Sequence, residues 1–287
     1  MKKVLVTGGA GFVGSNLCER LVSLGIYEVY SLDNYFTGSE NNHVEGVTYI
    51  KGSTADIDQL VQFKPDIIFH LGEYSRVEQS FGDIEKVWEF NVKGTFAVLE
   101  FVRKTGAKLL YAGSSTKFGD AGTGANASPY AWSKSSNTQL VKNYAEWYGI
   151  EFAITYFYNV YGKREIRHGK YATLIALFTE KMKAGETLTV VSPGTQKRNF
   201  THIDDTVDAL ILIAEHGKGD GYGIGNPDGY TILEVAELFG GNIEMLPERK
   251  GNRMIADVMS EKTLELGWTP KRKLPDYIEM LKQNNWN

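Results

Sequence analysis

The turn after the first apolar segment constrains the fold of this chain more than any other feature. Lys3–Thr7 is a short apolar run, Val13–Leu24 has helical spacing, and Gly8, Gly11 and Gly14 lie at the junction. Glycine allows a tight turn and a close approach of the backbone to a ligand, and a helix N-terminus offers free N–H groups to an anion. A strand, a G-x-x-G-x-x-G turn and a helix in this order predict a nucleotide-binding unit; the alternative is a sterically tight turn alone.

Short apolar runs and helical patterns alternate through the first half of the chain. The further predicted strands are Val29–Leu32, Val47–Lys51, Ile67–Leu71, Leu109–Gly113 and Glu151–Phe157. The predicted helices between them are Ile57–Phe63, Ile84–Lys104 and Pro129–Trp147. Continuous apolar strands separated by helices are typical of a parallel sheet that helices cover on both faces.

Beyond about residue 163 the elements become shorter and less regular, which indicates a second, smaller region. We therefore expect an α/β fold: a Rossmann-type doubly wound parallel sheet with a smaller C-terminal α/β substrate-binding region. In this interpretation residues 1–163 form the dinucleotide-binding domain, residues 199–215 pack back on it, and residues 164–287 form the substrate-binding region.

Composition and charge exclude several other classes of protein. The 287 residues include a single Cys, so neither an intrachain disulfide nor a cysteine-rich metal site is expected, and the reducing cytoplasm is the expected location. His168 and His202 lack acidic partners at ligand spacing, so we predict no metal. The net charge of −4 favours no nucleic acid partner. No run approaches the ~18 apolar residues of a membrane span, so no membrane association is expected.

Asp33 lies at the end of the second predicted strand and is followed by Asn34. A carboxylate at this point can accept hydrogen bonds from both hydroxyls of an adenosine ribose. It would repel a 2′-phosphate, and no Arg or Lys follows immediately to neutralise it, so the sequence favours NAD over NADP. The alternative is a loop aspartate that caps its own backbone.

Tyr130 and Lys134 are four residues apart on a predicted helix, so that the phenol and the ammonium share one face. A free tyrosine has a pKa of about 10 and is a poor base at neutral pH, but a neighbouring cation stabilises a phenolate. Ser114 ends a predicted strand, where sheets of this kind place their ligands. The alternative for the Tyr–Lys spacing is an exposed pair on a helix.

These motifs together resemble the extended short-chain dehydrogenase/reductase superfamily, and within it the nucleotide-sugar epimerase/dehydratase family. The resemblance extends along nearly the whole chain and is closest to sugar-nucleotide 4-epimerases. The further segments that carry it are His70–Gly72, Asn91–Thr95 (N-V-x-G-T), Phe157–Gly162 (F-N-V-Y-G), Gly194–Phe200 with His202–Asp205, Arg249–Gly251 (R-x-G) and Leu266–Pro270 (L-G-W-x-P).

The resemblance implies NAD as the cofactor and a nucleotide-diphosphate sugar as the substrate. Tyr130 would be the base, Lys134 would hold the nicotinamide ribose, and Ser114 would bind the same sugar oxygen as Tyr130. The implied cofactor-binding residues are Gly8, Gly11, Phe12, Val13, Asp33, Asn34, Ser53, Thr54, Leu71, Gly72, Tyr130 and Lys134. The implied substrate-binding residues are Glu73, Ser75, Thr116, Asn159, Arg198 and Arg249. For both arginines the alternative is a surface ion pair.

The resemblance leaves the reaction open, and the neighbours of Ser114 favour one choice. Dehydratases of this family carry a carboxylate just after the residue that matches Ser114, whereas this chain has Ser115 and Thr116. We therefore expect an epimerase that acts through a 4-keto intermediate. A 4,6-dehydratase is an alternative, since Glu73 could supply a carboxylate, and so are a nucleotide-sugar dehydrogenase or reductase and a non-catalytic NAD-binding regulator. The resemblance also implies a homodimer through the helices at 84–104 and 129–148.

Overall fold

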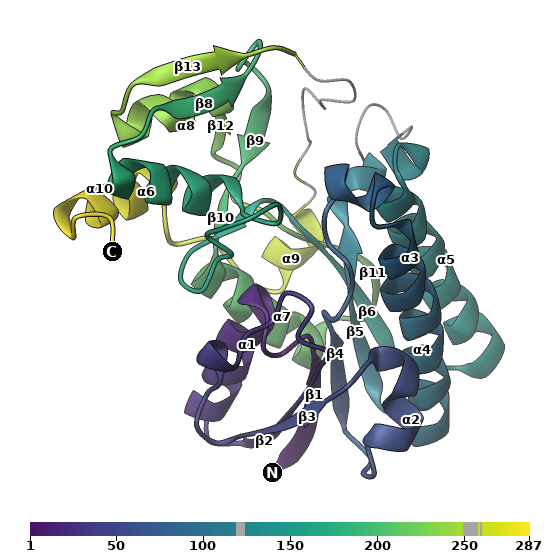
Figure 1. The fold of residues 1–287 in the computed structure, drawn as a ribbon. Helices are drawn as coiled ribbons and strands as arrows, with labels where there is room; N and C mark the ends of the chain where they lie inside the picture. The colour runs from purple at the N-terminus through teal and green to yellow at the C-terminus, as the bar shows by residue number, and fades with distance from the viewer. Residues whose placement is uncertain (119–123, 249–257, 259) are drawn as a thin grey trace.

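The computed structural model describes residues 1–118, 124–248, 258 and 260–287. Among these residues it contains a seven-stranded sheet in the order β11-β6-β5-β4-β1-β2-β3 (Figure 1). Every neighbouring pair in it is parallel. The strands are β1 (Lys2–Thr7), β2 (Tyr27–Asp33), β3 (Val47–Lys51), β4 (Ile67–His70), β5 (Lys108–Ser114), β6 (Phe152–Phe157) and β11 (Gly219–Ile224). The chain crosses from β1 to both sides, which confirms the predicted doubly wound Rossmann-type fold.

Helices cover both faces of this sheet, and alternate residues of its strands pack into two separate cores. Val4 and Val6 belong to one core and Leu5 to the other, because successive side chains of a strand point to opposite faces. The first core includes residues of α1 (Phe12–Ser23) and α7 (Ile203–His216). The second includes residues of α2 (Ile57–Leu60), α4 (Gly94–Thr105) and α5 (Pro129–Tyr148). Figure 1 shows the two groups of helices on opposite sides of the strands.

The predicted helix over Ile84–Lys104 is interrupted in the structure. It consists of α3 (Ile84–Val87), a π-helical segment η4 (Trp88–Lys93) and α4. Asn91 in the π-helical segment is completely buried and bonds to the loop after β4. The wider π turn therefore carries the side chain that contacts the loop after β4. Such π turns are frequently found at functional sites.

The C-terminal residues form a third core around short strand pairs. β8 (Leu188–Val191) pairs with β13 (Ile243–Leu246), β9 (Lys197–Asn199) with β12 (Gly229–Thr231), and β7 (Val160–Tyr161) with β10 (Thr201–His202). The helices of this part are α6 (Leu174–Ala184), α8 (Ile232–Phe239), α9 (Glu261–Glu265) and α10 (Leu274–Gln283). In Figure 1 most of these elements lie beyond the end of the sheet towards which β1 runs from the N-terminus.

Two segments from the second half return to the large sheet. α7 packs against α1, in the region 199–215 that the sequence assigned to the first domain. β11 then adds an edge strand beside β6. This strand was not predicted from the sequence. Its glycines at 219, 221 and 223 leave few apolar side chains, so the segment lacks the apolar run by which the other strands were recognised.

The remaining helical elements are short. They are the 3-10 turns η1 (Glu40–Asn42), η2 (Thr54–Asp56), η3 (Glu78–Phe81) and η5 (Ser115–Phe118). In the described part of the chain, no helix has the length and apolar character needed to cross a membrane.

Candidate active site

A cavity of about 590 Å³ lies where the sequence analysis expects the ligands, at the carboxyl ends of the central strands. Its wall on the sheet side includes the glycine turn, Asp33, Gly72 and Ser114, which follow or end β1, β2, β4 and β5. Its other side is lined by residues of the segment 157–175, by Arg198 of β9, by Phe200 and by Ile232. The cavity therefore lies between the large sheet and the C-terminal elements.

Gly8 and Gly14 of the glycine turn have no room for a side chain. A Cβ on Gly14 would lie 2.1 Å from the carbonyl oxygen of Gly8, and one on Gly8, which has a φ of +74°, would lie 2.9 Å from the Cα of Gly72. Gly11 caps α1 without a side-chain hydrogen bond, and Phe12 and Val13 in the first turn line the cavity. The uncapped N–H groups and the positive end of the helix fit the pyrophosphate of a dinucleotide.

Asp33 is buried beside this turn, and only 6% of the residue is exposed. One carboxylate oxygen accepts from the Ala10 N–H at 2.9 Å and the other from the Tyr35 N–H at 2.8 Å. Burial raises the pKa of Asp33 above its usual value, against the lowering effect of these N–H groups. Asp33 therefore caps its own loop, as in the alternative interpretation, and each oxygen keeps a further lone pair for a ribose hydroxyl.

The other residues predicted for the adenosine half lie around Asp33. Asn34 and Thr54 line the cavity, and the Asn34 side chain also accepts from the Phe36 N–H at 3.0 Å. Ser53 caps the turn η2, since its hydroxyl accepts from the Ala55 N–H at 3.2 Å.

Ser114, Tyr130 and Lys134 converge on the cavity from β5 and α5. Ser128 caps α5 by accepting from the Ala131 N–H, and Pro129 occupies the first turn, so Tyr130 lies at the start of the helix and Lys134 one turn later. The Tyr130 hydroxyl donates to Ser114 Oγ at 3.1 Å. The hydroxyl oxygen of Thr116 lies 2.9 Å from Ser114 Oγ. Three hydroxyl groups thus meet in the wall of a cavity that Lys134 also lines.

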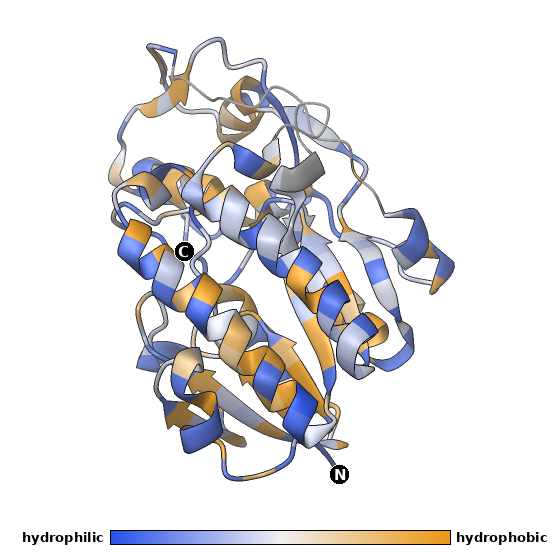
Figure 2. Cartoon of the chain, turned by 90° about the vertical axis from the view of Figure 1, so that its right-hand side faces the viewer, coloured by the Kyte–Doolittle hydropathy of each residue, from blue (hydrophilic) through white to orange (hydrophobic). Residues whose placement is uncertain are grey.

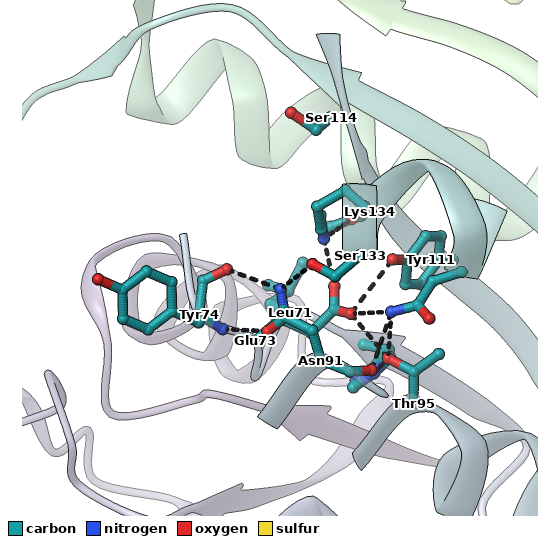
Figure 3. Close-up of polar contacts among 12 residues, drawn as sticks. Leu71, Glu73, Tyr74, Asn91, Thr95, Tyr111, Ser114, Ser133 and Lys134 are labelled. Carbon is teal, nitrogen blue, oxygen red and sulfur yellow. Dashed lines mark hydrogen bonds and ion pairs between the residues drawn. The ribbon is translucent and has the colours of Figure 1, made fainter. Parts of the chain in front are cut away.

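The Glu73 carboxylate is buried and does not face the cavity, although the residue contributes to the lining. Its side chain is 2% exposed, and its carboxylate forms an ion pair with Lys134, whose side chain is 6% exposed (Figure 3). The carboxylate also accepts hydrogen bonds from Thr95 at 2.7 Å, Asn137 at 2.9 Å and Tyr111 at 3.2 Å. Burial raises the pKa of Glu73, but Lys134 and these donors outweigh burial, and the pKa lies below its usual value. Glu73 is therefore a carboxylate held behind Lys134.

A chain of hydrogen bonds links the glycine turn to Glu73 through His70. Thr7 Oγ1 accepts from the Leu71 and Gly72 N–H groups and lies 2.8 Å from His70 Nδ1. His70 Nε2 lies 3.0 Å from the Thr95 hydroxyl, which donates to Glu73. Complete burial lowers the pKa of His70 to about 4, so the ring is neutral at pH 7. The network assigns the proton to Nε2, since the Thr7 hydroxyl must donate to Nδ1.

The other predicted substrate residues do not belong to this cluster. Ser75 is exposed and lines the cavity, and Asn159 lines it with a φ of +36° while its side chain donates to the Asn199 carbonyl at 2.9 Å. Arg198 lines the same cavity from β9 and donates to the Lys197 carbonyl at 2.8 Å. Arg249 lies outside the described residues.

Two charged residues of the cavity wall were missed by the sequence analysis. The Arg76 guanidinium donates twice to the Tyr171 carbonyl, at 2.9 and 2.7 Å. The Glu165 carboxyl accepts from the Gly162 N–H at 3.0 Å and from the Thr173 hydroxyl at 2.6 Å, and burial raises its pKa to about 7. Glu165 is only three residues beyond a motif glycine, but no local pattern marks its burial. Among the described residues, no group of three or more His, Cys, Asp or Glu side chains could hold a metal ion.

Comparisons with known proteins identify the family to which this chain belongs. The model of the NAD dependent epimerase/dehydratase family matches residues 4–225. UDP-glucuronic acid decarboxylase 3 of Arabidopsis thaliana is 30% identical, over 98% of this chain and 88% of its own length. A putative UDP-glucose 4-epimerase of Methanocaldococcus jannaschii is 30% identical, over 98% of this chain and 99% of its own.

A solved structure of an NAD-bound enzyme is also similar to this chain. The UDP-glucose 4-epimerase of Thermus thermophilus in complex with NAD superposes with a TM-score of 0.89 at 28% identity, and the match covers 99% of this chain and 98% of the other. The glycine turn, the uncapped N-terminus of α1 and Asp33 are the parts of this chain that fit such a cofactor. The chain therefore belongs to the NAD-dependent epimerase/dehydratase family, and NAD is its cofactor.

Proposed function

We propose that this protein is an epimerase that inverts C4 of a nucleotide-diphosphate sugar through a 4-keto intermediate. The observation that carries the proposal is the hydrogen bond of 3.1 Å from Tyr130 to Ser114, in the wall of a cavity that Lys134 also lines. Two hydroxyl groups already in contact are placed to bind one sugar hydroxyl between them.

Each residue of this group has a distinct role in the proposed reaction. Bound NAD supplies a reversible hydride acceptor at the sugar carbon. In its phenolate form Tyr130 takes the proton from the sugar hydroxyl, becoming a phenol, and later returns it, so the phenolate is regenerated and the proton balance closes without an external base. Ser114 donates a hydrogen bond to the sugar oxygen while its charge changes. Lys134, whose ammonium group is paired with Glu73, would donate a hydrogen bond to a ribose hydroxyl of the cofactor.

The neighbours of Ser114 support epimerisation over dehydration. Dehydration across C5 and C6 needs an additional acid and base, whereas Thr116, which contacts Ser114, offers only a hydroxyl. Glu73, the carboxylate considered for this role from the sequence, is paired with Lys134. An epimerase needs no further acid or base, because hydride and proton leave and return at the same carbon and oxygen.

A nucleotide sugar is the proposed substrate because of the cavity and the relatives. Arg198 and Asn159 line the wall opposite the glycine turn, and a guanidinium group suits a diphosphate. The relatives named above are enzymes of UDP-sugars. A decarboxylase of a nucleotide-linked uronic acid is the second candidate, favoured by the first of these relatives. It would use the same oxidation at C4.

We also propose a homodimer through the helices at 84–104 and 129–148. Trp88 of η4 and Trp132 of α5 stack with ring centroids 6.0 Å apart and planes 4° apart, and both are about half exposed. Ile84, Phe96 and Trp147 on the same helices are more than half exposed. Figure 2 views this side of the molecule, and apolar residues recur along its helices among polar ones. Exposed apolar side chains on adjacent helices favour burial against a second copy.

The experiment that tests the reaction is a product assay by NMR. NAD-loaded protein is incubated with UDP-, GDP-, dTDP- and CDP-sugars, including uronic acids. We expect a C4 epimer that is absent with Tyr130→Phe and present with Tyr148→Phe, which changes an exposed tyrosine of the same helix. A 4-keto-6-deoxy product would show a dehydratase, loss of CO₂ a decarboxylase, net oxidation or reduction a dehydrogenase or reductase, and no turnover a regulator.

A further inference from the structure

The strand order places Glu73 and Lys134 at the nicotinamide end of the dinucleotide site. Asp33 ends β2, the glycine turn follows β1, and Glu73 and Ser114 lie at the ends of β4 and β5, on the other side of β1. A dinucleotide with its adenosine ribose at Asp33 and its pyrophosphate at the N-terminus of α1 extends in this direction. Lys134 lines the same cavity at this end.

The carboxylate of Glu73 is fixed from four directions. Thr95 of α4, Asn137 of α5 and Tyr111 of β5 donate to one oxygen, and Lys134 contacts the other (Figure 3). The Lys134 ammonium donates in addition to the Ala112 carbonyl and lies 4.8 Å from the centroid of the Tyr111 ring. These contacts keep the carboxylate and the ammonium together, so their charges cancel at this point of the site.

The other titratable groups around the pair leave this balance in place. His70 on β4 is neutral, and burial keeps the Tyr111 phenol on β5 protonated by raising its pKa well above the usual value. Arg76 directs its guanidinium to the Tyr171 carbonyl, and Glu165 is bonded to Gly162 and Thr173. Arg76 and Glu165 line the cavity from loops, and both residues are unchanged in all the variants used below.

We propose that Glu73 sets the preference of this site for the oxidised cofactor. The nicotinamide ring carries a positive charge in NAD⁺ and none in NADH, so an isolated lysine at this end of the site would repel NAD⁺ alone. By cancelling the charge of Lys134, the Glu73 carboxylate removes this repulsion while leaving the ammonium to donate hydrogen bonds. A reaction that starts from NAD⁺ and ends with it benefits from this preference. The inference goes beyond the proposed function and depends only on NAD binding.

A purely structural role of the pair makes a different prediction. A buried ion pair can serve to hold two elements together, and removing one partner then destabilises the fold. Such a change would weaken NAD⁺ and NADH binding by the same factor. Only a role in charge balance changes the ratio of the two affinities.

The test is the ratio of dissociation constants, Kd(NADH)/Kd(NAD⁺), measured by calorimetry on cofactor-free protein. We expect Glu73→Gln to lower this ratio about tenfold or more, because at an effective dielectric constant of about 20 two unit charges within about 12 Å interact by at least that factor. Tenfold corresponds to a rise of about 30 mV in the reduction potential of the bound two-electron couple. Glu73→Asp, which keeps the charge, should retain a ratio close to that of the wild type.

Two further variants keep the test decisive if Glu73→Gln fails to fold. Lys134→Met leaves the carboxylate with its three neutral donors, and the double variant Glu73→Gln/Lys134→Met leaves no charge. Both variants lose the ammonium group. Lys134→Met keeps an unpaired negative charge and should have the higher ratio Kd(NADH)/Kd(NAD⁺), whereas the double variant, which has no charge at this point, should match the wild type. Equal ratios in Glu73→Gln and the wild type, or in these two variants, would overturn the proposal. Neither result depends on a sugar substrate.

Discussion

Glu165 makes the stability of this protein depend on pH in a direction that the structure fixes. The residue is 8% exposed, and burial raises the pKa of its carboxyl group from 4.5 to about 7. Below pH 4.5 the group is protonated in both the folded and the unfolded chain. Above this pH the unfolded chain ionises first, so the free energy of unfolding falls until the folded group ionises as well, at about pH 7. At about 1.4 kcal/mol per pKa unit, the total loss is about 3 kcal/mol.

Glu165→Gln removes this titration and retains one acceptor and one donor for Gly162 and Thr173. The stability of the variant relative to the wild type should therefore rise by about 2.5 kcal/mol between pH 5 and pH 8. Urea unfolding of both proteins at several pH values measures this difference. His70, whose pKa of about 4 destabilises the fold as pH falls below about 6.5, acts equally in both and cancels. Glu186→Gln, at an exposed position, controls for the lost surface charge.

A constant difference between wild type and Glu165→Gln across this pH range would refute the reasoning. It would mean that the Glu165 carboxylate is ionised in the folded protein at the same pH as in the unfolded chain. The hydrogen bonds from Gly162 and Thr173 would then compensate burial fully.

Three further predictions concern the cofactor and the proposed dimer. Gly14→Ala should destabilise the fold by at least about 3 kcal/mol and abolish NAD binding, because its Cβ would lie 2.1 Å from the Gly8 oxygen; near-normal calorimetric binding would contradict the tight turn. Asp33→Asn should raise the affinity for NADP relative to NAD by about tenfold, since a buried negative charge at the ribose is removed; an unchanged ratio would exclude this role. Wild-type protein should have twice the 32.0 kDa chain mass in light scattering and Trp88→Asp the single mass, and a monomeric wild type would refute the dimer.

Features with a local cause were predictable from the sequence. The glycine turn was predictable because three glycines at fixed spacing separate a strand from a helix. The structure shows that two of these glycines have no room for a Cβ. Tyr130 and Lys134 share a face because helical spacing dictates it. The strands of the first half were recognised because each is a continuous apolar run, as expected for a sheet buried on both faces.

Features that depend on tertiary contacts were not predictable in the same way. The strand β11 is rich in glycine and is recognisable only from its pairing with β6. The charge of Glu73 could have pointed to the sugar or to Lys134, 61 residues away, and only the contact between the loop after β4 and α5 decides between them. Glu165 owes its raised pKa to burial in the folded chain, and no pattern in the neighbouring sequence marks that burial.

The isotopic fate of the hydrogen on C4 of the substrate tests the central claim most directly. The substrate identified by the product assay is prepared with deuterium at C4 and converted in ordinary water by NAD-loaded protein. If the site around Tyr130 and Ser114 performs a reversible oxidation at C4, the product retains the deuterium at C4, and Tyr130→Phe forms no labelled product. Replacement of the deuterium by solvent hydrogen, or its transfer to C6, would contradict the account.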